Sequence, residues 1–173
     1  FAVYSTFLQR GYDMLIHDIA LEGLHVVLGV DRAGLVGADG ETPHGCFDAL
    51  FLSELPGYTV FCPASFAELR HMLRTALFDL DGPVAVRYPR GGEGAFRDDT
   101  AGRPLVRLRE GKDVTLLTYG VLVNHTLEAA ELLEREGIQA GVLKLNQIAP
   151  LDSEILDGYF EKTDILLVLE DCF

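Results

Sequence analysis

The chain has 173 residues, of which 49% are hydrophobic and 24% charged, so it holds enough apolar residues for a buried core in one or two domains. Its formal net charge of −13 argues against a nucleic-acid partner, because phosphate backbones select basic surfaces. It shows no signal peptide and no apolar run as long as a membrane span, which predicts a cytoplasmic protein with no membrane partner.

The first thirty residues predict a strand, a helix and a second strand. Residues 1–4 form the first strand, and Ser5 or Thr6 can cap the helix that follows it. The apolar residues of this helix recur with a 3.6-residue period and mark one buried face: Leu8, Tyr12, Leu15, Ile16 and Ile19. Residues 26–30 are a short continuous apolar run, typical of a strand that is covered on both faces in a parallel sheet.

Strands and helices continue to alternate up to residue 88. Residues 47–55 predict a helix and residues 58–62 a strand. Ser65 and Glu68 match the S-x-x-E capping box that begins a helix, and residues 83–88 form the next strand. This alternation predicts an α/β fold with a parallel sheet and helices on both faces.

The second half of the chain begins with a Gly-rich, charged segment, residues 93–112, which we expect to be an interdomain linker. Beyond it the alternation returns, with strands expected over 113–119, 138–145 and 165–170 and helices over 124–135 and after 150–152. Residues 113–173 therefore predict part of a second α/β domain. Because the chain starts without Met and stops just after a predicted strand, we expect it to be a fragment.

The most polar stretch of the chain, residues 31–47, directly follows a predicted buried strand. It therefore lies at a carboxyl end of the sheet, where ligands bind in open α/β folds. Its glycines allow close approach of the backbone to a ligand, and Arg32 can hold a phosphate or carboxylate through two parallel hydrogen bonds. Arg90 reaches the same edge, and two converging arginines suit a phosphate. The alternatives are a flexible surface loop and an arginine-rich turn whose salt bridges contribute little.

Three motif blocks resemble one enzyme family. They read YSTFLQR at residues 4–10, DRAGLVGADGxT at 31–42 and AVRYPRG at 85–91. In this order and at this spacing they resemble the 1-deoxy-D-xylulose-5-phosphate synthases, thiamine diphosphate enzymes of the transketolase superfamily. The similarity runs through essentially the whole chain but covers only part of the family's chain. It implies a pyrimidine-binding domain over residues 1–92 and part of a transketolase C-terminal domain over 113–173.

The resemblance also implies an activity and its cofactors. Enzymes of this family join pyruvate, after decarboxylation, to glyceraldehyde 3-phosphate, and the product is an isoprenoid precursor that also feeds thiamine synthesis. We therefore expect thiamine diphosphate and Mg²⁺ as cofactors, and a homodimer. The glutamate that activates the cofactor and the domain that binds Mg²⁺ and diphosphate are expected upstream of residue 1. No metal ligand is therefore assigned in this chain, and the fragment alone should be inactive.

The same resemblance assigns roles to individual residues. It places four residues on the substrate and phosphate side of the pocket: Tyr4, Arg32, Asp39 and Arg90. It places Phe7 against the aminopyrimidine ring of the cofactor, with Arg10 beside that ring.

His44 is the candidate catalytic residue, and here the chain departs from the family pattern. The family reads T-H-x-G at this point, whereas this chain has Thr42-Pro43-His44-Gly45. A displacement of one residue moves a side chain by roughly 3.8 Å along the backbone and can reverse its direction. His44 therefore either replaces the family's histidine or has a structural role.

Other interpretations remain open. Another thiamine diphosphate enzyme, such as a transketolase or a β-type subunit of a 2-oxo acid dehydrogenase, would share the architecture but would not be expected to carry the first two motif blocks together. A non-catalytic paralogue or assembly module is supported only by the displaced His44. A nucleophilic pair of Cys46 and His44 lacks a motif for an orienting third group. Cys46, Cys62 and Cys172 show no CxxC spacing and are expected to be reduced thiols.

Overall fold

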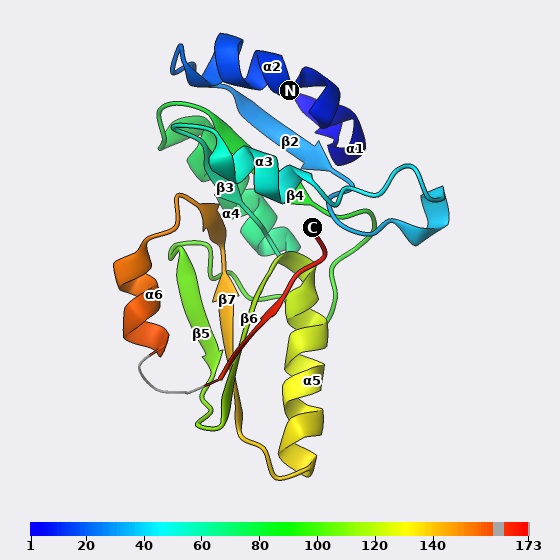
Figure 1. Cartoon of the computed structure of the whole chain (residues 1–173), viewed down its shortest axis with the longest axis vertical. Coiled ribbons are helices and arrows are strands. Elements are labelled where there is room, and N and C mark those ends of the chain that lie inside the picture. The colour runs from blue at the N-terminus through cyan, green and yellow to red at the C-terminus, as the bar shows by residue number, and fades with distance from the viewer. Residues whose placement is uncertain (161–164, 173) are drawn as a thin grey trace.

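A computed structural model describes residues 1–160 and 165–172 of the chain. It contains two sheets, formed mainly by the first and the second half of the chain, with helices packed against them (Figure 1). The predicted α/β fold is confirmed, although one strand in each sheet runs antiparallel to its neighbour.

The first sheet has the strand order β1-β2-β4-β3-β8. Its strands are β1 (Ala2–Tyr4), β2 (Val27–Asp31), β3 (Thr59–Phe61), β4 (Val84–Tyr88) and β8 (Gln147–Ala149). The first four are parallel, whereas β8, from the second half of the chain, pairs antiparallel with β3. The carboxyl ends of the four parallel strands therefore meet at one edge of the sheet.

Helices cover both faces of this sheet. On one face lie α3 (Asp48–Glu54) and a helical segment of four short pieces: α1 (Ser5–Leu8), a 3₁₀ turn (Gln9–Gly11), α2 (Tyr12–Met14) and a π-helical stretch (Leu15–Ala20). The buried side chains of this face surround Val30 and Val60. On the opposite face α4 (Phe66–Phe78) packs Met72 against Val86.

The predicted capping box starts α4, with one modification. The Ser65 side chain accepts a hydrogen bond from the Glu68 N–H at 3.1 Å, as expected for an N-cap. The Glu68 carboxylate, however, accepts the N–H of Ala64 at 2.8 Å, one residue before the cap. The box therefore fixes the turn that enters α4 as well as the first turn of the helix.

The second sheet has the strand order β5-β7-β6-β9. Its strands are β5 (Leu105–Arg109), β6 (Val114–Tyr119), β7 (Ala140–Leu145) and β9 (Leu166–Leu169), and all pairs are parallel except β5 with β7. A 3₁₀ turn (Gly120–Leu122) leads into α5 (Val123–Arg135), which covers one face around Ala130 and Val142. On the other face α6 (Ser153–Phe160) packs through Leu156 and Tyr159.

Strand β5 lies inside the segment 93–112, for which a linker was expected. The strand itself was not predicted, because arginines interrupt its apolar pattern, LVRLR, and glycines surround it. Leu105 and Val106 are nevertheless buried, and β5 pairs with β7. Residues 105–109 thus belong to the second sheet.

Buried polar contacts join the two halves of the chain. Lys144 on β7 forms an ion pair with Glu68 on α4 at 2.9 Å, and both side chains are fully buried. Asn146 follows β7, and its side-chain amide donates to the backbone carbonyl of Thr100 at 2.7 Å. The backbone carbonyl of Asn146 accepts the Cys62 N–H at 2.9 Å. No helix among the described residues is long and apolar enough to cross a membrane.

Candidate active site

The ends of three parallel strands bring the predicted site residues together. The register of the sheet places Tyr4 of β1 beside Asp31 of β2, and Asp31 beside Tyr88 of β4. Just beyond these residues, the N–H of Ala33 still donates to the carbonyl of Tyr88 at 3.0 Å. Strands β2 and β4 therefore end side by side, and Arg32 and Arg90 follow these two strand ends.

Arg32 has an unusual backbone conformation, and its side chain is fixed by several contacts. It is the one non-glycine residue of the described chain with a positive φ, 58°, a conformation that is uncommon for a side chain of this size and concentrates at functional sites. Its Nε donates to Asp39 at 2.8 Å and its Nη1 to Asp31 at 3.0 Å. Its guanidinium carbon lies 4.0 Å from the centre of the Tyr4 ring. The guanidinium is therefore stacked and bonded in one orientation.

Asp39 joins the two arginines of the site. One oxygen of its carboxylate accepts from Arg32, and the other lies 3.0 Å from Nε of Arg90. The hydrogen bond with Asp39 raises the pKa of Arg32 above its ordinary value, although desolvation acts in the opposite direction. The charged guanidinium groups of Arg32 and Arg90 thus lie close together around Asp39, an arrangement that suits binding of a phosphate or carboxylate.

An aromatic pair continues this cluster on its other side. The rings of Tyr4 and Phe7 are stacked, with centroids 5.9 Å apart and planes 11° from parallel. The guanidinium of Arg10 lies 5.5 Å from the centre of the Phe7 ring, and half of Phe7 is exposed. The exposed ring, with a cation beside it, offers a surface on which a planar aromatic ligand can stack.

His44 lies in the same loop, residues 31–47, which we call the site loop. Its Nδ1 accepts the N–H of Val36 at 2.9 Å, which assigns the proton of a neutral imidazole to Nε2. Two backbone hydrogen bonds between Gly34 and Gly45 close the base of the loop, at 2.8 and 2.9 Å. His44 therefore bonds to the backbone of the loop, whereas Arg32, Asp39 and Arg90 form a connected cluster.

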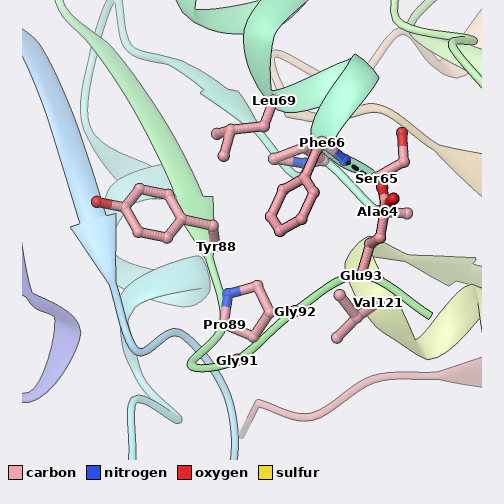
Figure 2. A pocket seen from close by; sticks show the side chains of 11 residues that line it. Ala64, Ser65, Phe66, Leu69, Tyr88, Pro89, Gly91, Gly92, Glu93 and Val121 are labelled. Atoms are coloured by element: carbon pink, nitrogen blue, oxygen red, sulfur yellow. Dashed lines mark hydrogen bonds between the residues drawn. The ribbon is translucent and has the colours of Figure 1, made fainter. Parts of the chain in front are cut away.

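A small pocket of about 60 Å³ lies near this edge (Figure 2). Phe66 and Leu69 of α4 face Tyr88 and Pro89 across it, and Val121 closes it from the second half of the chain. Its walls include none of the predicted site residues. Its one carboxylate, Glu93, already accepts the Phe66 N–H at 2.9 Å. We therefore place the candidate site at the arginine and aromatic cluster rather than in this pocket.

The nucleophilic pair of Cys46 and His44 is not supported by the geometry. Cys46 is buried, and burial raises the pKa of its thiol, so it stays protonated at neutral pH. His44 bonds to Val36 through Nδ1.

Sequence reasoning missed the ion pair behind the site. Arg87 belongs to a motif, but its side chain points into the protein and pairs with Asp48 at 2.8 Å. Burial alone would lower the pKa of Arg87, but the Cys62 thiol and the Asp48 carboxylate hold it well above its usual value. The only signal in the sequence was the position of Arg87 within a buried strand, next to Val86.

Comparison with known proteins identifies relatives of both halves of the chain. The family model described as "Transketolase, pyrimidine binding domain" matches residues 1–92, and "Transketolase, C-terminal domain" matches residues 105–173. A 1-deoxy-D-xylulose-5-phosphate synthase of Chlorobaculum tepidum is 50% identical over 99% of this chain and 28% of its own length. The enzyme of the same name from Heliobacterium modesticaldum is 46% identical over 98% of this chain and 27% of its own length.

Solved structures show the same fold. A structure described as a split gene transketolase, inactive β4 tetramer, has a TM-score of 0.87 and 30% identity, and the match covers 99% of this chain and 56% of that chain. A transketolase of Pichia stipitis has a TM-score of 0.84 at 17% identity, over 99% of this chain and 27% of that chain. This chain thus spans about 28% of the length of the curated relatives it matches.

Proposed function

This chain belongs to the transketolase family, and on that premise we propose that it is part of a 1-deoxy-D-xylulose-5-phosphate synthase. Such an enzyme condenses pyruvate, with loss of CO₂, with glyceraldehyde 3-phosphate. Relatives of that name are 43–50% identical across the chain, and they support this assignment over other members of the family. The observation that carries the proposal is the pair of arginines joined by Asp39 beside an exposed aromatic ring.

We propose that Arg32 and Arg90 bind the phosphate of glyceraldehyde 3-phosphate. Each presents a charged fork at the carboxyl edge of the sheet, where phosphates and other ligands bind in such folds. Asp39 sets the spacing of the two guanidinium groups, and Tyr4 stacks under Arg32. These four residues thus bind and orient the aldehyde substrate. In a cofactor-dependent enzyme, binding and orientation of the substrate are a large part of the protein's contribution to the rate.

The residues at the aromatic end of the cluster fit part of thiamine diphosphate. We propose that the half-exposed ring of Phe7 stacks on the aminopyrimidine ring and that Arg10 lies at its side. When bound, the cofactor supplies the carbanion chemistry. Mg²⁺, the diphosphate group and the activating glutamate are assigned in this proposal to a part of the enzyme outside the chain. A homodimer in the cytoplasm is part of the same proposal, with the three free thiols in support of a reducing compartment.

We propose that His44 is the catalytic residue of the chain and that it acts through Nε2. Because Nδ1 is occupied by the Val36 N–H, the Nε2–H is the group that His44 can present to a substrate oxygen.

The second candidate is a non-catalytic module of the same fold. It is favoured by one observation, which is that Pro43 stands where the resembled family has its histidine. A module of this kind would bind its partner polypeptides but would not turn over pyruvate.

A turnover assay separates the two candidates. The complete enzyme that contains this chain is incubated with pyruvate, glyceraldehyde 3-phosphate, thiamine diphosphate and Mg²⁺, and CO₂ and 1-deoxy-D-xylulose 5-phosphate are measured. The proposed synthase gives both products in equal amounts, and neither forms without thiamine diphosphate. A complete enzyme that binds the cofactor yet releases no CO₂ would favour the non-catalytic module.

A further inference from the structure

The ion pair behind the site loop is almost completely closed to solvent. The side chain of Arg87 is 4% exposed and that of Asp48 is fully buried. Nε of Arg87 donates to one carboxylate oxygen of Asp48 at 2.8 Å and Nη2 to the other at 3.4 Å. A buried pair with this geometry holds its two chain segments in one arrangement, because separation would leave an uncompensated charge inside the protein.

The pair joins β4, the strand beside the start of the site loop, to α3, the helix that follows the end of the loop. Arg87 lies on β4, whose end also accepts the N–H of Ala33 at the start of the loop. Asp48 is the first residue of α3 and directly follows the loop. Between them, Gly45 packs so closely against Ser5 that a side chain has no room there.

The same arginine also contacts the segment that follows the last strand of the second sheet. Beyond β9 the chain returns to the base of the site loop, where Figure 1 shows the red segment rising toward the first sheet. Nη2 of Arg87 donates to the thiol of Cys172 at 3.0 Å and lies 3.7 Å from the carboxylate of Asp171. The Cys172 thiol in turn donates to the carbonyl of Gly45 at 3.8 Å, and the Asp171 carboxylate occupies the space that a side chain at Gly34 would need.

From these contacts we infer that Arg87 is a positioning residue for the proposed reaction. Its side chain ties β4 to Asp48 at the end of the site loop and to Asp171 and Cys172 in the second half of the chain, and so sets the positions of Arg32, Asp39 and His44. Arg87 itself does not contact the substrate in this proposal, because its buried guanidinium is bonded to Asp48 and Cys172. The kinetic part of this inference rests on the proposed function, whereas the clamp does not.

Hydrogen exchange in the complete enzyme tests the clamp directly. Three amides of the site loop report on it, since Gly34, Val36 and Gly45 all donate hydrogen bonds within the loop. In Arg87→Met we expect the peptide that contains them to exchange about tenfold faster or more, while α5 stays unchanged. The matched control is Lys144→Met, which also breaks a buried ion pair between the halves but should leave the loop peptide unchanged. Equal acceleration over the whole chain in Arg87→Met, or none in the loop, would overturn the inference.

Steady-state kinetics then test the positioning role. Arg87→Met should raise KM for glyceraldehyde 3-phosphate on the order of tenfold, with KM for unphosphorylated glyceraldehyde within about twofold of wild type. If Arg87→Met folds poorly, Asp171→Asn is tested instead, because it spares the buried pair of Arg87 and Asp48. We expect it to raise KM for glyceraldehyde 3-phosphate by a smaller factor. An equal rise in both KM values, or no change in kcat and in either KM, would contradict the positioning role. If the wild-type enzyme forms no product, the proposed function fails, and the exchange result still decides whether Arg87 clamps the loop.

Discussion

Arg32 shows how a single residue marks the site. A left-handed backbone at a non-glycine residue costs on the order of 1–3 kcal/mol and persists only where neighbours hold it. Here the holders are the Asp39 and Asp31 carboxylates and the ring of Tyr4. In this conformation the guanidinium contacts Tyr4 of β1, Asp31 of β2 and Asp39 of the site loop.

Two substitutions at His44 separate a chemical role from a structural one. His44→Ala removes both the acceptor of the Val36 N–H and the Nε2–H, whereas the amide oxygen of His44→Asn can still accept from Val36. If His44 is catalytic, kcat falls on the order of 10²-fold or more in both variants, which a turnover assay of the complete enzyme measures. Wild-type turnover in His44→Asn would return this residue to a purely structural role.

Tyr58 carries a buried hydroxyl without a hydrogen-bond partner among the described residues. Burial raises the pKa of Tyr58 from 10 to about 12. The unfolded chain therefore loses this proton first, and the free energy of unfolding falls as the pH rises from 10 to 12. We expect Tyr58→Phe to lose less stability than wild type over this range.

At neutral pH the same variant should be as stable as wild type or more stable by about 1 kcal/mol, since it removes an unpaired polar group and keeps the ring. Urea unfolding at pH 7 and at several values between 10 and 12 checks both expectations. A variant that is less stable at pH 7 would mean that the hydroxyl has a partner, such as a buried water.

The sequence predicted the convergence of the site better than the clamp behind it. Arg32 and Arg90 each follow a strand of one parallel sheet, so their meeting at one edge follows from topology alone. The partnership of Arg87 with Asp48 spans 39 residues and depends on which strand neighbours α3, which no local pattern contains. The bond of His44 to Val36 was equally hidden, because it depends on the loop conformation.

At the scale of elements, the helical segment after β1 shows both the strength and the limit of a periodic pattern. The buried face was predicted correctly, since Leu8 and Leu15 lie in the core. The pattern did not reveal the breaks. They begin with the 3₁₀ turn Gln9–Gly11 and end in π-helical turns, such as the bond from the Leu21 N–H to the Ile16 carbonyl. Glycine and wider turns change the hydrogen bonding while the apolar stripe stays on one face.

The buried ion pair of Lys144 on β7 and Glu68 on α4 leads to a prediction about stability. Burial lowers the pKa of Lys144, while Glu68 favours its charged form. Lys144→Met leaves the Glu68 carboxylate buried without its cation, so we expect a loss of about 3–5 kcal/mol in the free energy of unfolding. Adding Glu68→Gln to this variant should recover part of the loss, because no buried charge remains.

The exposed pair of Arg109 and Glu134 is the control for this prediction. Its charged atoms are 2.8 Å apart, against 2.9 Å for Lys144 and Glu68, but Glu134 is 64% exposed. Arg109→Met should therefore cost less than about 1 kcal/mol in urea unfolding. Similar losses for Lys144→Met and Arg109→Met would contradict the role given to burial.

At the scale of the whole molecule, the two halves are more closely joined than the expected linker suggested. Strand β8 crosses into the first sheet, and Asp171 and Cys172 contact the base of the site loop. Neither contact has a sequence signature, since β8 has three residues and its pairing with β3 is long-range. The division into a domain over residues 1–92 and a second domain from residue 113 stays a prediction, with β5 now placed in the second sheet.

Under the proposed function, Arg32 and Arg90 of this chain bind the phosphate of glyceraldehyde 3-phosphate in the complete enzyme. The most direct test of this role compares KM for glyceraldehyde 3-phosphate with KM for unphosphorylated glyceraldehyde in the complete enzyme. We predict that Arg90→Gln raises the first about 10- to 100-fold, as loss of a charged hydrogen bond implies, and leaves the second within about twofold. Arg97→Gln, on an arginine that is 72% exposed outside the cluster, should change neither. Equal changes in both KM values for Arg90→Gln, or no change in either, would contradict the account.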